Sequence, residues 1–262
     1  MKKIVILFSI FLCVILCGGV VAKLFVKTET PTEETPQIVE SVDYSKLIYT
    51  ALGDSITWGQ DGITKTRMTT PYCDSVGQNL GLKKVYNLGI GNSSVAKMLS
   101  CDCHDNYDTA HTPMCERYSN ISIYSDIISI FGGVNDRGLS VPLGDISSYD
   151  KSTFYGAYNT LIKGVKTNYS SAWVFLITPT SSRKTQTDDW TNNIGLTRLD
   201  YVNAVLELGE KWNLPVLELH DNESINNELL DYDTDGVHPS QDTHTNIIAP
   251  LVAQFIKDNY KK

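Results

Sequence analysis

The sequence predicts an α/β protein in which a five-stranded parallel sheet lies between two layers of helices, a three-layer α/β/α sandwich. Two observations lead to this fold. Short apolar runs alternate along the chain with segments of helical periodicity. The runs are continuously apolar, which is typical of strands buried on both faces of a parallel sheet. Right-handed crossovers between parallel strands then place helices on both sides.

The five predicted strands are apolar runs that end at glycine, proline or polar residues. The first ends at Gly53, the third at Gly132, and the fourth is closed by Pro179. These residues are common in turns, so they mark where each strand stops. The strands are expected at residues 47–52, 84–88, 126–131, 172–177 and 215–219.

The predicted helices show apolar residues at helical spacing. Pro71 begins the first and Gly81 ends it, which is the usual asymmetry of helix termini. Amphipathic patterns predict further helices at 151–168 and 194–212. A last helix has an apolar face that is formed by Ile247, Ile248, Leu251, Val252 and Phe255.

The N-terminal residues differ from the rest in composition. Lys2 and Lys3 precede an apolar run, and residues 1–26 are expected to be a signal peptide or a membrane anchor that contacts the membrane through 4–26. Cys17 also allows a lipid-anchor signal, but Leu16 is bulkier than the residue usual there. Residues 27–45 are polar and are expected to be a flexible tether. Residues 46–262 would then be a folded domain outside the cytoplasm.

The net charge of −8 argues against a nucleic-acid partner, because phosphate binding requires clustered Lys and Arg. Four cysteines follow the tether, and an even number outside the cytoplasm first indicates two disulfides. A metal site is the second interpretation, since three of these cysteines and two histidines lie close together in the sequence, and free thiols are the third. The disulfide candidates are Cys73, Cys101, Cys103 and Cys115, and the metal candidates are Cys101, Cys103, His104, His111 and Cys115.

Polar motifs follow four of the predicted strands. They are Gly-Asp-Ser at 53–55, a Gly/Asn/Ser loop at 87–94, Gly-Val-Asn-Asp at 133–136 and Asp-Gly-Val-His at 235–238. Each motif alone is an ordinary loop. Ligands of parallel sheets bind outside the carboxyl ends of the strands, so the occurrence of these motifs together at that edge predicts an active site.

The residue types are those that ester cleavage requires. Ser55 supplies a nucleophile, His238 a base, and Asp235 lies three residues before His238, where it can orient the imidazole. The developing oxyanion needs donors, which we expect to be the Ser55 N–H, a backbone N–H of the Gly91–Asn92 turn and the Asn135 side-chain amide. Asp54 and Asp136 are expected to fix loops through hydrogen bonds, and His220 and His244 to be structural or surface residues.

These motifs resemble those of the SGNH hydrolases, also called the GDSL esterase/lipase family, over about residues 46–260. The resemblance implies a flavodoxin-like sandwich, a Ser-His-Asp triad and no metal or cofactor. The family places a glycine in the second oxyanion position, which falls here on Asn92 rather than on Gly91. Asparagine is the residue that best replaces glycine at positive φ, so Asn92 is the first choice and Gly91 the second. No Gly-x-Ser-x-Gly motif surrounds Ser55, which disfavours the α/β-hydrolase fold.

The substrate expected from the sequence is a short acyl ester, such as an O-acetyl group on carbohydrate. Residues 100–124 are polar and lack a long apolar stripe that would receive a lipid chain. Tyr107, Tyr118 and Trp190 are aromatic residues that can stack on sugar rings. The alternatives are a lipase or lysophospholipase, a glycan O-acyltransferase, and a non-catalytic binding domain.

Overall fold

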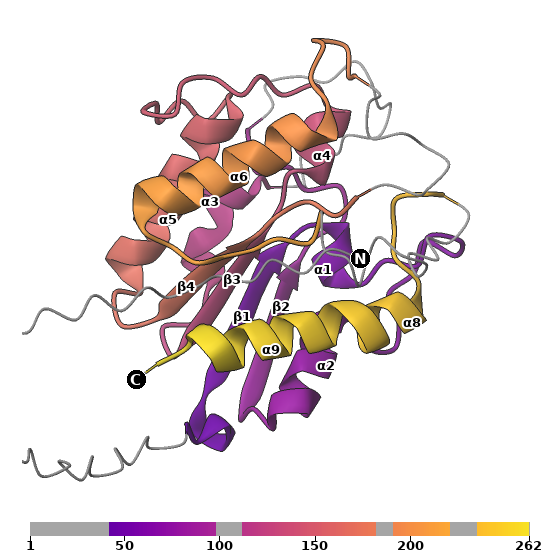
Figure 1. The fold of residues 1–262 in the computed structure, drawn as a ribbon, viewed down its shortest axis with the longest axis vertical. Coiled ribbons are helices and arrows are strands. Elements are labelled where there is room, and N and C mark those ends of the chain that lie inside the picture. Colours follow the sequence, from indigo (N-terminus) through magenta and orange to yellow (C-terminus); the bar gives the residue numbers. More distant parts are fainter. Residues whose placement is uncertain (1–41, 98–111, 182–190, 221–234, 262) are drawn as a thin grey trace, which may run out of the picture. The chain divides into compact units, whose positions relative to one another are not determined.

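A computed structural model describes residues 42–97, 112–181, 191–220 and 235–261. These residues contain five parallel strands in the order β2-β1-β3-β4-β5 (Figure 1). The strands are β1 (Ile48–Gly53), β2 (Lys84–Gly89), β3 (Ile127–Phe131), β4 (Trp173–Ile177) and β5 (Val216–Leu217). The predicted five-stranded parallel sheet is therefore confirmed.

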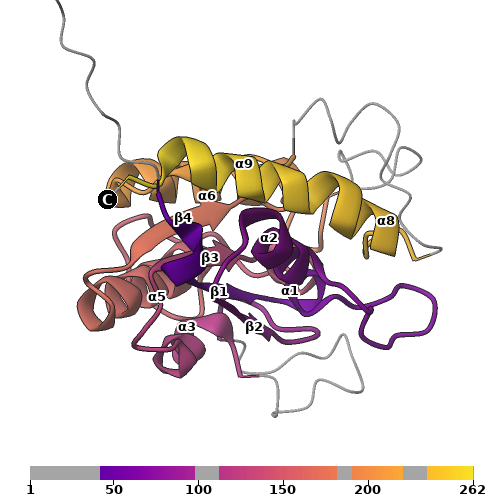
Figure 2. The same cartoon turned by 90° about the horizontal axis from the view of Figure 1, so that it is seen from below.

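Helices cover both faces of the sheet (Figures 1 and 2). On one face lie α2 (Tyr72–Leu80) and α9 (Ala249–Asn259), which pack against each other. On the other lie α3 (Met114–Arg117), α5 (Phe154–Asn168) and α6 (Arg198–Trp212). Shorter helices are α1 (Ser55–Trp58), α4 (Val134–Gly138), α8 (Gln241–Thr243), a π-helix at His244–Ile248, and 3₁₀ turns at Tyr44–Lys46 and Tyr118–Asn120.

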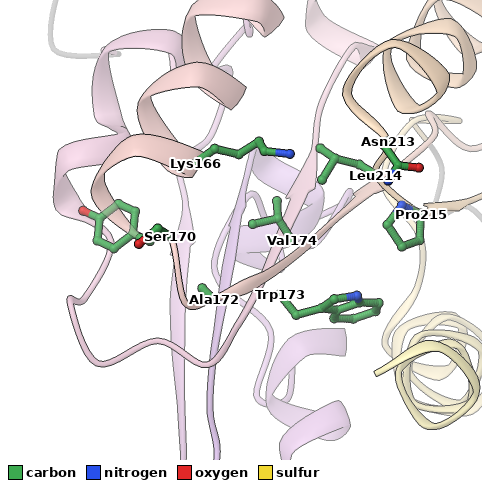
Figure 3. A pocket seen from close by; sticks show the side chains of 9 residues that line it. Lys166, Ser170, Ala172, Trp173, Val174, Asn213, Leu214 and Pro215 are labelled. Atoms are coloured by element: carbon green, nitrogen blue, oxygen red, sulfur yellow. The ribbon is translucent and has the colours of Figure 1, made fainter. Parts of the chain in front are cut away.

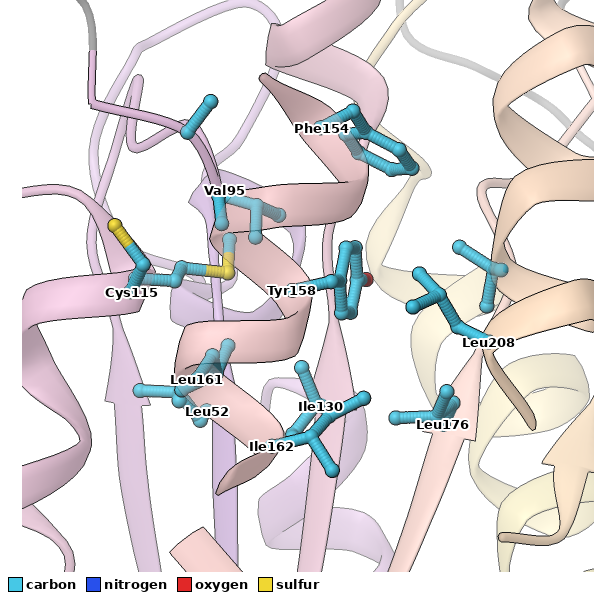
Figure 4. Close-up of a cluster of buried hydrophobic side chains, with 14 of the residues drawn as sticks. Leu52, Val95, Cys115, Ile130, Phe154, Tyr158, Leu161, Ile162, Leu176 and Leu208 are labelled. Carbon is cyan, nitrogen blue, oxygen red and sulfur yellow. The ribbon is translucent and has the colours of Figure 1, made fainter. Parts of the chain in front are cut away.

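Each face of the sheet has its own hydrophobic core. Leu52, Ile130 and Leu176 extend from neighbouring strands toward α5 and α6, where Tyr158 and Leu208 meet them (Figure 4). Alternate strand residues point the other way and pack with α2 and α9. The two cores fix the strands, and hence the loops at their carboxyl ends, from both sides.

The predicted helices and strands agree with the structure to within a few residues, with two informative differences. Helix α6 begins at Arg198 rather than at residue 194, because Thr197 and Asp200 form a reciprocal capping box at that point. Strand β5 has two residues instead of five, Val216 and Leu217. Helix α2 ends at Leu80, as Gly81 predicted, and Gly81 adopts the left-handed conformation with φ 65°.

The disulfide prediction is wrong for Cys73 and Cys115, which are both buried free thiols. Cys73 belongs to the core under α2, whereas Cys115 belongs to the core on the opposite face of the sheet. The sheet therefore separates them, and burial raises the pKa of both thiols. Cys101 and Cys103 lie outside the described residues.

The predictions for residues 1–41 fall outside the described residues, which begin at residue 42. The last residues of the predicted tether, 42–45, are described: Tyr44 begins a 3₁₀ turn, and Val42 and Tyr44 pack against the core under α2 and α9. Within the described ranges, no helix combines the length and the apolar character that a membrane span requires. The predicted membrane segment at 4–26 stays a prediction.

A cavity of about 600 Å³ lies at the amino end of β4, away from the carboxyl ends of the strands (Figure 3). Lys166, Trp173, Val174, Leu214 and Pro215 are among the residues that line it. None of the site residues predicted from the sequence contributes to its wall.

Candidate active site

Ser55 lies at the first position of α1, directly after β1. The Asp54 side chain caps this helix by accepting a hydrogen bond from the Ile56 N–H at 2.9 Å. A Cβ atom on Gly53 would lie 2.0 Å from Thr57 Oγ1, so only glycine permits the tight turn. The turn leaves the Ser55 side chain 4% exposed. The sequence Gly-Asp-Ser thus builds the turn, and Asp54 has the loop-fixing position expected for it.

His238 reaches Ser55 from the loop before α8. His238 Nε2 lies 2.9 Å from Ser55 Oγ, and His238 Nδ1 lies 2.7 Å from Asp235 Oδ2. The other Asp235 oxygen, Oδ1, accepts from the backbone N–H groups of Val237 and His238 at 2.9 and 3.0 Å. The structure therefore brings the hydroxyl, the imidazole and the carboxylate into one hydrogen-bonded series.

Asp235 is surrounded by hydrogen-bond donors. Burial alone would raise its pKa, but the His238 amide, the Lys65 ammonium, the His238 ring and the Val237 amide together hold the pKa well below its ordinary value. Asp235 is thus ionised at neutral pH. An ionised partner at Nδ1 favours the tautomer whose Nε2 is free to accept the Ser55 proton.

Lys65 is a site residue that the sequence did not single out. Its ammonium donates to Asp235 Oδ2 at 2.8 Å and to the Gly62 carbonyl at 2.5 Å. Lys65 itself has φ 59°, an unusual conformation for a non-glycine residue. Asp61 organises its loop by accepting from the backbone N–H groups of Ile63 and Thr64.

The turn after β2 adopts the expected left-handed conformation at Asn92, where φ is 56°, while Gly91 is not among the glycines with positive φ. The Asn135 side-chain amide donates to the Ser93 carbonyl at 3.0 Å, which ties α4 to this turn. An amide nitrogen has two hydrogens, so Asn135 keeps a second one for another acceptor.

Asp136 fixes the chain beyond the turn. Its two carboxylate oxygens each accept one backbone N–H, from Val95 and from Ala96, both at 2.9 Å. Burial raises the pKa of Asp136 to about 6, although these two hydrogen bonds oppose the shift. Asp136 therefore has the loop-fixing position that its motif suggested.

Arg117 is the second residue that sequence reasoning missed. It is 3% exposed, and it binds residues next to the turns that carry Ser55 and Asn92. Its guanidinium donates to the carbonyls of Gly53 and Leu88 and to the Ser93 hydroxyl. No local pattern reveals such a residue, because its partners come from three distant segments and two of them are backbone groups.

Other candidates take structural positions or lie outside the described residues. His244 is fully buried, accepts from the Tyr72 N–H at 3.1 Å, and has its pKa lowered to about 3 by burial and by the nearby His238. Tyr118 packs on Gly164 of α5, so it belongs to the core rather than to a sugar platform. Tyr107, Trp190, His104 and His111 are not described.

No group of three or more His, Cys, Asp or Glu side chains within the described ranges is arranged to hold a metal ion. Cys101, Cys103, His104 and His111, which suggested the metal alternative, lie outside those ranges.

Fold and site together define a class of hydrolase in which a hydroxyl at the end of the first strand of an α/β/α sandwich meets an imidazole near the C-terminus. The chain belongs to the GDSL-like Lipase/Acylhydrolase family, whose sequence profile matches residues 51–245. It is accordingly an enzyme that hydrolyses ester bonds. A comparison with curated proteins found no match.

Solved structures share the fold over most of the chain. A protein from Lactobacillus plantarum is 27% identical, with a TM-score of 0.67 over 83% of this chain and 99% of its own. A lipase/acylhydrolase from Enterococcus faecalis is 20% identical, with a TM-score of 0.55 over 82% of this chain and 97% of its own. A carbohydrate acetylesterase family member from Sinorhizobium meliloti is 14% identical, with a TM-score of 0.56 over 80% of this chain and 99% of its own.

Proposed function

We propose that the protein hydrolyses short-chain acyl esters with Ser55, His238 and Asp235 as its catalytic triad. The observation that carries this proposal is the unbroken hydrogen-bonded series from Ser55 Oγ through both ring nitrogens of His238 to Asp235. In this arrangement the base contacts the nucleophile, and an ionised carboxylate orients the base and stabilises its cation.

The reaction has two steps. Ser55 Oγ attacks the ester carbonyl carbon while His238 Nε2 takes the hydroxyl proton, and the alcohol leaves with that proton when the C–O bond breaks. Water then attacks the acyl-enzyme while His238 takes its proton. His238 returns this proton to Ser55 Oγ when the bond to the acyl carbon breaks, and the carboxylic acid is released. In both steps the carbonyl oxygen becomes negative, and the Ser55 N–H, the Asn92 N–H and the Asn135 amide stabilise it.

We propose an O-acetyl group on carbohydrate as the substrate. Ser55 and His238 are only 4% and 8% exposed, which favours a small acyl group at the nucleophile. The likeness in fold to a carbohydrate acetylesterase family member agrees with this assignment. A location outside the cytoplasm, inferred from the composition of residues 1–26, would bring the enzyme to cell-surface glycans.

The nucleophile is tested with Ser55→Ala and p-nitrophenyl acetate. We expect kcat to fall by several orders of magnitude while the circular dichroism spectrum stays unchanged. A fluorophosphonate probe should label the wild type and not the variant. Near-normal turnover by Ser55→Ala would show that another group is the nucleophile.

The acyl group is tested with p-nitrophenyl esters of increasing chain length, followed by acetate release from acetylated glycans. We expect kcat/KM to be highest for acetate and to fall with each added pair of methylenes. A preference for chains of about eight carbons or more would assign the enzyme to lipids instead. Protease treatment of intact cells tests the location, because an exported domain is digested and a cytoplasmic one is protected.

A further inference from the structure

We propose that Arg117 is a positioning residue for this reaction. Its guanidinium holds the Gly91–Asn92 turn, which carries a proposed oxyanion donor, at a fixed distance from Ser55. The inference rests on the proposed function, because it assigns a role within the same site. Among the described residues, the Arg117 side chain hydrogen-bonds to Leu88, Gly53 and Ser93 and not to Ser55 or His238, so it acts through the groups that it binds.

The guanidinium joins three segments that are far apart in the sequence. Arg117 Nη1 donates to the Leu88 carbonyl at 2.7 Å, and Nη2 donates to the Gly53 carbonyl at 2.8 Å and to Ser93 Oγ at 3.1 Å. Gly53 ends β1 and Leu88 is the penultimate residue of the neighbouring β2. A planar fork reaches three acceptors in fixed directions, which the single ammonium of lysine does not reproduce.

The three segments are those that carry the reacting groups. Gly53 lies two residues before Ser55, and Ser93 directly follows Asn92. The Ser93 carbonyl is also the acceptor of the Asn135 amide at 3.0 Å. The Asn92 N–H and the Asn135 side-chain amide, the two proposed oxyanion donors other than the Ser55 N–H, are therefore both held next to Ser93. The contact of Arg117 with Ser93 then sets their distance from Ser55.

A small displacement at this point has a large kinetic effect. Oxyanion donors stabilise the transition state only when they lie about 3 Å from the developing charge. A misplacement of about 1 Å in such a site is enough to lower a rate by about 100-fold. The contact at Ser93 is thus worth more to turnover than to stability.

The charge of Arg117 adds to its geometry. Burial lowers the pKa of Arg117 to about 10 and the nearby Asp54 carboxylate opposes the shift, so the guanidinium is cationic at neutral pH. Its hydrogen-bond acceptors among the described residues are two carbonyls and a hydroxyl, all uncharged. A buried cation held by neutral groups carries a large desolvation cost.

Two neighbouring serines give a matched test. Ser93 and Ser94 are both fully buried, and each hydroxyl lies near backbone carbonyls: Ser93 Oγ near those of Ser94 and Thr112 at 3.3 Å, and Ser94 Oγ at 2.7 Å from that of Ala96. Of the two hydroxyls, that of Ser93 accepts a hydrogen bond from Arg117, whereas that of Ser94 bonds to the Ala96 carbonyl. Ser93→Ala and Ser94→Ala therefore each remove one buried hydroxyl from the same segment. Only the first also removes the hydrogen bond to Arg117.

With p-nitrophenyl acetate and the full chain, we expect Ser93→Ala to lower kcat at least tenfold with KM within about twofold. Ser94→Ala should keep kcat within about twofold of wild type. Arg117→Lys, which keeps the charge but not the fork, should lower kcat at least as much as Ser93→Ala. If Arg117→Lys fails to fold, the serine pair decides.

Equal kcat values for the two serine variants would overturn the role of Arg117, as would a wild-type kcat for Arg117→Lys. These results are distinct from failure of the proposed function. If Ser55→Ala is inactive while Ser93→Ala matches wild type, the triad stands and only the inference on Arg117 falls. If Ser55→Ala retains activity, the site itself is wrongly assigned.

Discussion

Replacing Asp235 with asparagine is the most informative change at the proposed triad, because it removes one charge and alters no side-chain volume. In the wild type four donors surround the carboxylate. Oδ1 accepts from the Val237 and His238 backbone N–H groups, and Oδ2 accepts from His238 Nδ1 and Lys65 Nζ. An asparagine side chain has one accepting oxygen, so one pair of donors must face its NH₂ group.

The two amide orientations are unequal. With NH₂ at the Oδ1 position, two backbone N–H groups lose their acceptor, at a cost of about 1–3 kcal/mol each. With NH₂ at the Oδ2 position, Lys65 can turn into solvent, since its side chain is 56% exposed. The second orientation is therefore preferred, and it forces His238 Nδ1 to become the acceptor. Nε2 then carries the proton and cannot accept one from Ser55.

We expect kcat of Asp235→Asn to fall by about 10³–10⁴, which corresponds to about 4–5.5 kcal/mol of transition-state stabilisation. The assay is hydrolysis of p-nitrophenyl acetate at neutral pH, with circular dichroism as the test of folding. Asp242→Asn is the matched control, since Asp242 is exposed on α8 and makes the same change in charge. A kcat above about a tenth of wild type in Asp235→Asn would refute the reasoning that this carboxylate fixes the tautomer.

Three further outcomes are expected. Lys65→Met should lower kcat/KM by at most about fivefold, because Lys65 forms an exposed ion pair, and this loss should be smaller at high salt. The same ratio of wild-type to variant kcat/KM at all salt concentrations would contradict this. Burial raises the pKa of Asp54 to about 7, because the folded protein favours the protonated carboxyl. The contribution of Asp54 to the free energy of unfolding is therefore complete below about pH 4 and is lost as the pH rises through 7. From pH 5 to pH 8, the urea midpoint should accordingly decrease less in Asp54→Asn than in wild type. The same pH dependence of the midpoint in both proteins would count against the raised pKa of Asp54. Cys73 and Cys115 should react with a thiol reagent only after unfolding, and rapid reaction in the native state would exclude their burial.

The fold could be predicted because its signals are local. Apolar runs that end at glycine specify buried strands, and the structure has a strand at each of the five predicted places. Gly81 and Asn92 adopt the left-handed conformation that their residue types favour. The order of the motifs along the chain, combined with a parallel sheet, also placed Ser55, His238 and Asp235 at one edge.

The missed features depend on contacts that no local pattern encodes. Arg117 binds two backbone carbonyls, and every residue has one, so the sequence does not indicate which carbonyls need a guanidinium. Lys65 meets Asp235 across a separation of 170 residues. The cysteine count suggested pairing for Cys73 and Cys115, but the count contains no information on which face of the sheet each thiol occupies.

The proposed base and nucleophile are separated by 183 residues, so the hydroxyl is made early in synthesis and the imidazole late. A nascent polypeptide that stops before residue 235 has a serine with nothing to deprotonate it. Contacts of α2 with α9, and of Tyr72 with His244, hold the two termini of the domain together. Ester hydrolysis therefore requires that α9 has packed against the rest of the domain. Two fragments, one with Ser55 and the other with His238, would each be inactive and would regain activity only by reassociating.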